Sequence, residues 1–384
     1  MKKVKLSLAT ILLVGSCSAV NADSLIEAFK NGTTSGDISL AYEVRNQDKE
    51  TSTYYSDTEY AVSSIGLYYK TASYKNFSLN IGMRAFTSIF EDDKNFDTGH
   101  GKGDSTERFY DYDGHSLLTD TYLAYDIDKV SVKIGRQKLY EMGLTHLFDG
   151  ITVRTTPLEN MNFDLIYVEG RGRADIKNIR PVEDINENKG LYKVALAYKF
   201  NENFKAKAYY FDAPDAYDMT GGKINFDTKI GEVKTGLQVQ YIEASKDDLP
   251  NEDEELSEIK AYATYEGYTT TLGYYETGKD SDLYGAIAKT GETIVPFEEG
   301  DPSYDADAKT TYLQVSKSFG KTNITALYGL MEHGKYDSDE LDIWLGYNFN
   351  ENIAFTLGYT RMNMDEDSSY TDLDQLNATI SYKF

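Results

Sequence analysis

The sequence has little cysteine and proline, and it has a single long apolar run at its start. Its 384 residues contain one Cys and six Pro, and 63 acidic against 39 basic side chains give a formal net charge of −24. Such a chain lacks the cationic surface that nucleic acid requires of a partner. After residue 20 there is no run of about 18 apolar residues, so no transmembrane helix is expected. These absences leave a soluble protein or a membrane β-barrel.

The start of the chain has the features of a secretory signal peptide. Three lysines within the first five residues precede the apolar run 6–14, and small residues lead up to Ala22. We therefore expect residues 1–22 to be a signal peptide that is cleaved after Ala22. A lipoprotein signal acylated at Cys17 is the alternative, although Gly-Ser before this cysteine matches such a site poorly. Cleavage after Ala22 would leave a mature chain without cysteine and therefore without a disulfide, which suits a Gram-negative envelope.

From Ser35 onward, apolar and polar residues alternate in runs of about ten residues, the length that a tilted strand needs to cross a membrane. The first run places Ile38, Leu40, Tyr42 and Val44 on one face. Counting the clear and the weaker runs gives eighteen strands. The 33 tyrosines and 17 phenylalanines crowd the ends of the runs, as in the aromatic girdles of membrane barrels.

The connections between these runs alternate between short and long. Turns such as 201–203 and 350–352 are tight, whereas 91–116, 169–188 and 277–307 are long. This asymmetry is typical of outer-membrane barrels, while a soluble β-sandwich or solenoid, the alternative for a period of two, does not need it. The sequence therefore predicts an all-β fold, a transmembrane antiparallel β-barrel with short periplasmic turns and long extracellular loops. The barrel is expected over residues 35–384, after a short N-terminal periplasmic segment at 23–34.

Three stretches of the sequence resemble known membrane proteins. The end of the chain resembles the assembly signal of bacterial outer-membrane barrels, with large residues alternating up to a terminal phenylalanine: Leu376, Ala378, Ile380, Tyr382 and Phe384. Gly135-Arg136-Gln137, with 148–154 and 164–167, resembles the central strands of eighteen-stranded porins of the OprD-like, alginate-export and epsilonproteobacterial major-porin families. Residues 24–32 resemble the helix that opens many major porins, with a capping box at Ser24 and Glu27 and an end at Gly32.

This resemblance implies a location and a set of partners. The location is the Gram-negative cell outer membrane. The partners are membrane lipid, lipopolysaccharide, the barrel assembly machinery and small hydrophilic solutes and ions. Homotrimers occur among such porins, although no subunit interface can be identified in this sequence.

The face opposite the large apolar residues is expected to line the channel. A basic sector covers the first two-thirds of this face, and the last six strands are nearly neutral. The pore-lining residues predicted in this way are Arg84, Lys133, Arg154, Lys193, Lys199, Lys205, Lys207, Lys234, Lys260, Asp120 and Asp164. Such a sector predicts a transverse field that orients polar solutes, whereas the plain alternative is that these side chains only stay solvated. Arg136 has the parity of the lipid face unless a bulge turns it.

Two kinds of loop are distinguished by charge. The loop 169–188 is the candidate for a constriction of the pore because it carries charges of both signs: Arg171, Arg173, Arg180, Asp175 and Glu183. The outer loops 91–113, 243–255 and 280–307 are acidic. They are expected to concentrate cations or to bind divalent ions that bridge to lipopolysaccharide, with plain solvation as the alternative.

An enzymatic function has little support. The four histidines, His100, His115, His146 and His333, all fall in predicted loops, and no hydrolase or zinc motif is present. We predict no catalytic residue, no metal ligand and no cofactor. The sequence favours an outer-membrane porin that forms a water-filled channel for passive diffusion. The alternatives are a substrate-specific channel, in which the basic sector is a binding track, and a surface adhesin or structural barrel.

Overall fold

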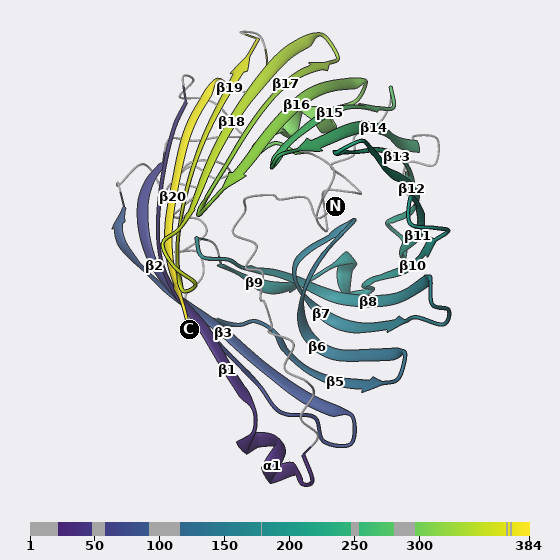
Figure 1. The fold of residues 1–384 in the computed structure, drawn as a ribbon, viewed down its shortest axis with the longest axis vertical. Helices are drawn as coiled ribbons and strands as arrows, with labels where there is room; N and C mark the ends of the chain where they lie inside the picture. The colour runs from purple at the N-terminus through teal and green to yellow at the C-terminus, as the bar shows by residue number, and fades with distance from the viewer. Residues whose placement is uncertain are drawn as a thin grey trace.

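The computed structural model describes residues 22–47, 58–91, 116–177, 179–246, 253–279, 296–365, 368 and 371–384. The predicted signal peptide up to residue 21, with Cys17, and most of the predicted acidic loops lie outside these ranges. Within them the strands form one antiparallel sheet (Figure 1). The sheet closes into a barrel because β1 (Thr33–Gln47) pairs with both β2 (Thr58–Lys70) and β20 (Leu373–Lys383). No helix in the described ranges is long and apolar enough to cross a membrane.

Eighteen strands form the barrel wall in the described part of the chain, which confirms the predicted fold. β4 (Ser116–Leu118) and β5 (Thr121–Ile127) count as one broken strand, since both pair with β3 (Phe77–Glu91), and β9 (Ile179–Asp184) lies inside the barrel. The other wall strands are β6 (Val130–Glu141), β7 (Leu144–Thr155), β8 (Met161–Ala174), β10 (Leu191–Lys199), β11 (Phe204–Ala213), β12 (Tyr217–Ile230), β13 (Val233–Lys246), β14 (Asp253–Tyr265), β15 (Tyr268–Thr277), β16 (Ala308–Phe319), β17 (Thr322–His333), β18 (Tyr336–Asn348) and β19 (Ile353–Met364).

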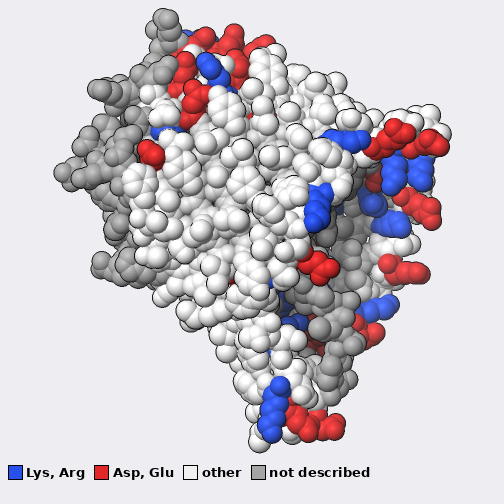
Figure 2. Space-filling view, turned by 60° about the vertical axis from the view of Figure 1, so that its left-hand side comes forward, with Lys and Arg blue, Asp and Glu red and all other residues white. Residues whose placement is uncertain are grey.

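The period-two alternation explains which way the side chains face. Large apolar residues such as Ile38, Leu40 and Val239 are exposed on the outside, while their neighbours in the chain point inward. Figure 2 shows one face of this outer surface as a broad area without charged side chains, with charged residues gathered toward its margins. An apolar band of this kind is solvated by lipid, and barrel closure satisfies the backbone hydrogen bonds that lipid cannot.

Aromatic rings mark both edges of the apolar band. At the short turns, rings pack against each other, as in Phe77 with Tyr125 at 4.6 Å between ring centres and Tyr198 with Phe200 at 4.8 Å. At the opposite edge, tyrosine hydroxyls donate hydrogen bonds to carboxylates of neighbouring positions: Tyr42 to Glu59 (2.8 Å), Tyr210 to Asp218 (2.6 Å), Tyr274 to Glu276 (2.6 Å) and Tyr359 to Asp374 (2.5 Å). Rings with one polar end suit a boundary between lipid and water.

The segment before the barrel contains the expected short helix. Helix α1 spans Leu25–Lys30, and the Ser24 hydroxyl accepts a hydrogen bond from the Glu27 backbone N–H at 3.2 Å. The Glu27 carboxylate accepts from the backbone N–H of Asp23 at 3.1 Å, one residue before the position that a capping box would use. The wall begins at Thr33, two residues earlier than expected.

Two connections at the loop end fold into the barrel instead of standing above it. The first is the hairpin that β9 forms with residues 170–174 at the end of β8, and Figure 1 shows β9 inside the ring of strands. Its apolar residues Ala174 and Ile179 are buried with Tyr60, Val62 and Phe86 of the β2–β3 wall. The hairpin therefore reaches from β8 through the interior to the wall formed by β2 and β3.

The second inward connection is 296–307, between β15 and β16, with a short 3-10 helix, η3, at Asp301–Tyr304. Phe297 and Tyr304 are buried with Tyr275 and Tyr312 of the wall. Gly329 on β17 makes room for this packing, since a Cβ there would overlap the ring of Phe297. The sequence placed 280–307 among the outer loops, and for residues 296–305 that prediction is wrong.

Candidate functional site

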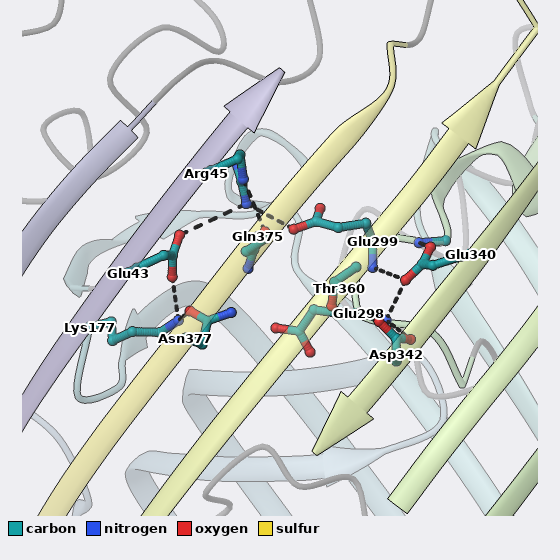
Figure 3. A network of polar contacts seen from close by, with 11 residues as sticks. Glu43, Arg45, Lys177, Glu298, Glu299, Glu340, Asp342, Thr360, Gln375 and Asn377 are labelled. Atoms are coloured by element: carbon teal, nitrogen blue, oxygen red, sulfur yellow. Dashed lines mark hydrogen bonds and ion pairs between the residues drawn. The ribbon is translucent and has the colours of Figure 1, made fainter. Parts of the chain in front are cut away.

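The two inward connections reach the same part of the wall, formed by β18, β19, β20 and β1. Figure 3 shows the polar contacts there. We call this group the constriction network, and its members are Glu43, Arg45, Lys177, Glu298, Glu299, Glu340, Asp342, Thr360, Gln375 and Asn377. The members come from four wall strands and from both inward connections.

Lys177 ties the hairpin to the wall. It lies in the tip between β8 and β9, and its ammonium group donates to the carboxylate of Glu43 on β1 and to the side-chain oxygen of Asn377 on β20 (Figure 3). Glu43 is 4% exposed, so this ion pair is largely shielded from water. A pair in such a place is stronger than one on a surface.

Arg45 joins β1, β20 and the second inward connection. Its Nε donates to the Gln375 side chain on β20 at 3.0 Å, and its Nη2 lies 2.8 Å from a carboxylate oxygen of Glu299. The same nitrogen is 3.9 Å from Glu43, which also contacts Lys177. Through Glu43 and Arg45, the anchors of the two inward connections are neighbours.

Two buried carboxylates hold the backbone of the second connection. Glu340 on β18 accepts hydrogen bonds from the backbone N–H groups of Glu298 (3.0 Å), Glu299 (3.0 Å) and Gly300 (2.9 Å). Asp342 accepts from the Glu298 N–H at 3.2 Å and from the Thr360 hydroxyl at 2.6 Å. An irregular segment inside a barrel has no strand partner for its N–H groups, so these carboxylates supply the missing acceptors.

Acidic groups outnumber basic ones in the constriction network. Glu43, Glu298, Glu299, Glu340 and Asp342 face two cations, Arg45 and Lys177. Burial raises the pKa of Glu299 to about 8, although the Arg45 guanidinium opposes this shift. The expectation that the last six strands are nearly neutral inside is wrong at Glu340 on β18, which is a buried inward carboxyl group.

The predicted pore-lining residues do not form one open basic surface. Arg84 and Lys193 face inward but are 2% and 1% exposed. Arg84 lies 2.6 Å from Asp37 and 2.7 Å from the Ser64 hydroxyl, and Lys193 lies 2.9 Å from Glu141. Both differ from the expectation of an exposed pore lining.

Other predicted cations are partly neutralised or stand near the turns. Lys260 is 2.6 Å from Glu258, and Arg154 is 2.8 Å from Glu141. Lys133 lies over the ring of Tyr122, 4.8 Å from its centre. Four more lysines lie toward the turn ends of β10, β11 and β13. Lys199, Lys205 and Lys234 are exposed, and Lys207 is half-buried.

Asp120 does not line the pore as predicted. It falls in the break between β4 and β5, where an extra residue interrupts the alternation. Its carboxylate accepts the backbone N–H of Lys138 at 3.1 Å and so replaces a ladder hydrogen bond that the break removes. Asp164, in contrast, lies half-buried on the inward face of β8.

The residues suggested for the constriction loop lie on the inward hairpin. Arg171 and Arg173 are on β8, Arg180 and the exposed Glu183 are on β9, and Asp175 is at the tip. Arg173 Nε lies 2.7 Å from Asp175. Burial opposes the charge of Asp175, but Arg173 and His146 lower its pKa to about 2.

Two histidines lie on strands and not in loops as predicted, and Arg136 has an ion-pair partner on the neighbouring strand. His146 and His333 were expected in loops but are on β7 and β17, where each lies near an aspartate of an inward connection, Asp175 at 3.8 Å and Asp305 at 3.1 Å. Arg136 forms a two-pronged ion pair with Asp149, at 2.6 and 2.7 Å. Within the described ranges no group of three His, Cys, Asp or Glu residues could hold a metal ion.

The closed barrel with its lipid-facing band defines an outer-membrane β-barrel protein. A family model described as "Putative outer membrane protein" matches residues 46–242, just over half of the chain, and the chain belongs to this family. A search of curated proteins found no match. The family supports the outer membrane as the location.

Solved channel structures share the fold. OccAB4 of Acinetobacter baumannii superposes with a TM-score of 0.74 at 15% identity, covering 92% of this chain and 98% of that one. OccK1 (OpdK) of Pseudomonas aeruginosa gives 0.73 at 14% identity, covering 93% and 99%. A structure of OpdK with vanillate from the same organism gives 0.74 at 14% identity, with the same coverage. At these identities the likeness establishes the fold, and it agrees with the resemblance to eighteen-stranded porins.

Proposed function

We propose that this chain is an outer-membrane porin that forms a water-filled channel for passive diffusion of small hydrophilic solutes and ions. The observation that supports this proposal most directly is an eighteen-stranded barrel whose interior is narrowed by two anchored connections. A barrel with this many strands is too wide for side chains alone to fill, so it leaves an aqueous path.

The constriction in this proposal is the space between the β8–β9 hairpin and the connection 296–307. The hairpin brings Arg171, Arg173 and Arg180 into the interior, and the facing network contributes an excess of carboxylates. Charges of opposite sign across a narrow aqueous path orient polar solutes and disfavour apolar ones. This supports a filter based on charge and size.

Processing and assembly belong to the same proposal. Residues 1–22 act as a cleaved signal peptide, and residues 23–34 lead from the periplasm into the barrel, whose first strand begins at Thr33. At the end of the chain, the exposed side chains of Ile380 and Tyr382 on β20, and of Phe384 directly after it, offer an outward row to the barrel assembly machinery. Lipid and lipopolysaccharide surround the apolar band, and homotrimers are the assembly that the resemblance suggests. No catalytic step and no cofactor are part of this function.

The test is the conductance of the purified, refolded mature chain in a planar lipid bilayer. Stepwise openings of large conductance are expected because the aqueous path stays open. A protein that is folded and inserted yet gives no openings would refute the channel and favour the adhesin or structural barrel. A solute that reduces the current in a saturable way would favour the substrate-specific channel.

A further inference from the structure

The inner wall contains a recess that is separate from the constriction network. It has a volume of about 510 Å³ and is lined by the β5–β6 turn, the end of β7, the start of β8, and parts of β10 and β11. Its charged residues are Asp126, Asp128, Lys129, Arg154, Asp164 and Lys207. These strands meet there at their turn ends, so the recess faces the periplasmic mouth. Its size falls in the range of small-molecule sites.

Strand register places charges of alternating sign around this recess. Ser131 on β6 pairs with Arg154 on β7, and Arg154 pairs with Asp164 on β8. Two residues closer to the turn, on the same face of β8, Asn162 pairs with Ala197 on β10. Ala197 in turn pairs with Lys207 on β11. Neighbouring strands are about 4.8 Å apart, so positive and negative groups line the recess at spacings of a few ångströms. The small side chain of Ala197 leaves the space between Asp164 and Lys207 open.

The two half-buried charges of the recess lack close partners. Asp164 and Lys207 are half-buried, and in the described part of the chain neither has a hydrogen bond or an ion pair within 4.0 Å. The other four charges are exposed, and two of them are engaged: Arg154 contacts Glu141 at 2.8 Å, and Asp126 accepts from Ser131 at 2.6 Å. Partly desolvated charges without partners are costly, so groups of opposite charge bind there favourably.

We propose that this recess is a binding site for small zwitterionic solutes, that is, amino acids and short peptides on their way to the periplasm. The carboxylate of the solute is held by Lys207, with Arg154 close by, and its ammonium group is held by Asp164. Thr155 and Asn162 offer hydrogen-bonding groups to the rest of the solute. This inference rests on the proposed channel function, because the recess is reached through the lumen.

Three probes with the same glycine core separate the charges of the ligand. Glycylglycine carries both charges, N-acetylglycine carries only the carboxylate, and glycinamide at slightly acid pH carries only the ammonium group. Each is added to the full channel in a bilayer, and the ion current is followed against probe concentration. We expect glycylglycine to reduce the current saturably, at a half-saturating concentration about tenfold below that of either other probe.

Two single variants test the two ends of the site. Lys207→Gln and Asp164→Asn are each expected to raise the half-saturating concentration of glycylglycine about three- to tenfold. Lys229→Gln is the matched control, because it removes a lysine from the inward parity of the neighbouring β12, outside the recess. This control is expected to leave glycylglycine binding unchanged.

The outcomes distinguish this inference from the channel function itself. Normal openings with equal effects of all three probes would overturn the zwitterion site. So would N-acetylglycine binding as tightly as glycylglycine, because the recess would then be an anion site. Unchanged glycylglycine binding in both Lys207→Gln and Asp164→Asn would overturn it as well. A folded, inserted protein without any openings would instead refute the channel.

Discussion

At the scale of single residues, Arg45 bonds the second inward connection and lies beside Glu43, the residue that anchors the first. Its guanidinium bonds Gln375 and Glu299 and lies beside Glu43, and its side chain is 7% exposed. Such a buried cation is costly to remove, because Gln375 and Glu299 lose a hydrogen-bond donor and the carboxylate of Glu43 loses a neighbouring positive charge.

Replacing Arg45 is expected to widen the channel. In Arg45→Ala, the connection 296–307 loses the hydrogen bond that Arg45 donates to Glu299, and the side chain itself leaves the constriction. We expect a larger and noisier single-channel conductance in a planar bilayer. Arg361→Ala is the control, since Arg361 is exposed and donates to Asn363 of its own strand at 3.1 Å. A conductance in Arg45→Ala equal to that of the parent would contradict this role.

Glu299 makes the docking of the second connection sensitive to pH. Burial raises its pKa to about 8 in the folded protein, against 4.5 for a free glutamate. Folding therefore favours the protonated form, and its contribution to docking is complete below pH 4.5 and is lost as the pH rises through about 8. The charges around it are Arg45, Glu298, Asp301 and Glu43.

We therefore expect current noise from this connection to increase as the pH is raised through about 8. In Glu299→Gln, which stays neutral, the noise should remain at its low-pH level over the whole range. Single-channel recordings of both proteins in the same buffers provide the measurement. If the variant shows the same rise as the parent, another group causes the pH dependence.

At the scale of elements, the packing of the connection 296–307 depends on a glycine in the wall. Gly329 on β17 has the ring of Phe297 in the place of a side chain. Without that space the aromatic anchor could not approach the strand, since interiors do not accept overlap.

Gly329→Val is expected to displace Phe297 and release this connection while the barrel stays folded. The predicted cost of the overlap is about 1–3 kcal/mol, which falls on docking and not on the strands. Limited proteolysis should cut within 296–305 faster than in the parent, and conductance should rise. Gly222→Ala is the control, because a Cβ there meets only the Lys207 carbonyl oxygen at 3.9 Å. Equal proteolysis of Gly329→Val and the parent would count against this packing.

At the scale of the whole molecule, ion preference depends on which charges stay open to the channel. The cations that dominated the inward face in the sequence are in part paired or buried, as for Arg84, Lys193 and Lys260. In the constriction network Glu43 is paired with Lys177, and burial keeps Glu299 protonated below about pH 8, whereas Glu298 is exposed. The narrowest region dominates selectivity, so carboxylates there favour cations.

We expect the channel to prefer potassium over chloride, as read from the reversal potential in a salt gradient. Glu298→Gln should reduce this preference, because it removes an exposed negative charge at the constriction. Glu266→Gln, in the turn between β14 and β15, should leave it unchanged. Anion preference of the parent would point to the hairpin arginines or the basic sector as the controlling charges.

The sequence by itself determined the barrel and which side chains of each strand face lipid or the interior. Alternation at a period of two assigns Ile38 and Leu40 to lipid and Asp37 and Ser39 to the interior, because successive side chains of a strand point to opposite faces. Short turns at 201–203 and 350–352 could be predicted for the same local reason, since few conformations join two paired strands so closely.

Only the tertiary structure decided how the interior is filled. Glu340 accepts hydrogen bonds from Glu298, Glu299 and Gly300 across some 40 positions of sequence, and Lys177 contacts Asn377 across 200. No periodicity encodes such contacts, because they arise where barrel closure brings β1, β18 and β20 together. The same holds for Arg84 and Lys193, which parity assigned to the interior but whose burial depends on acidic neighbours from other strands.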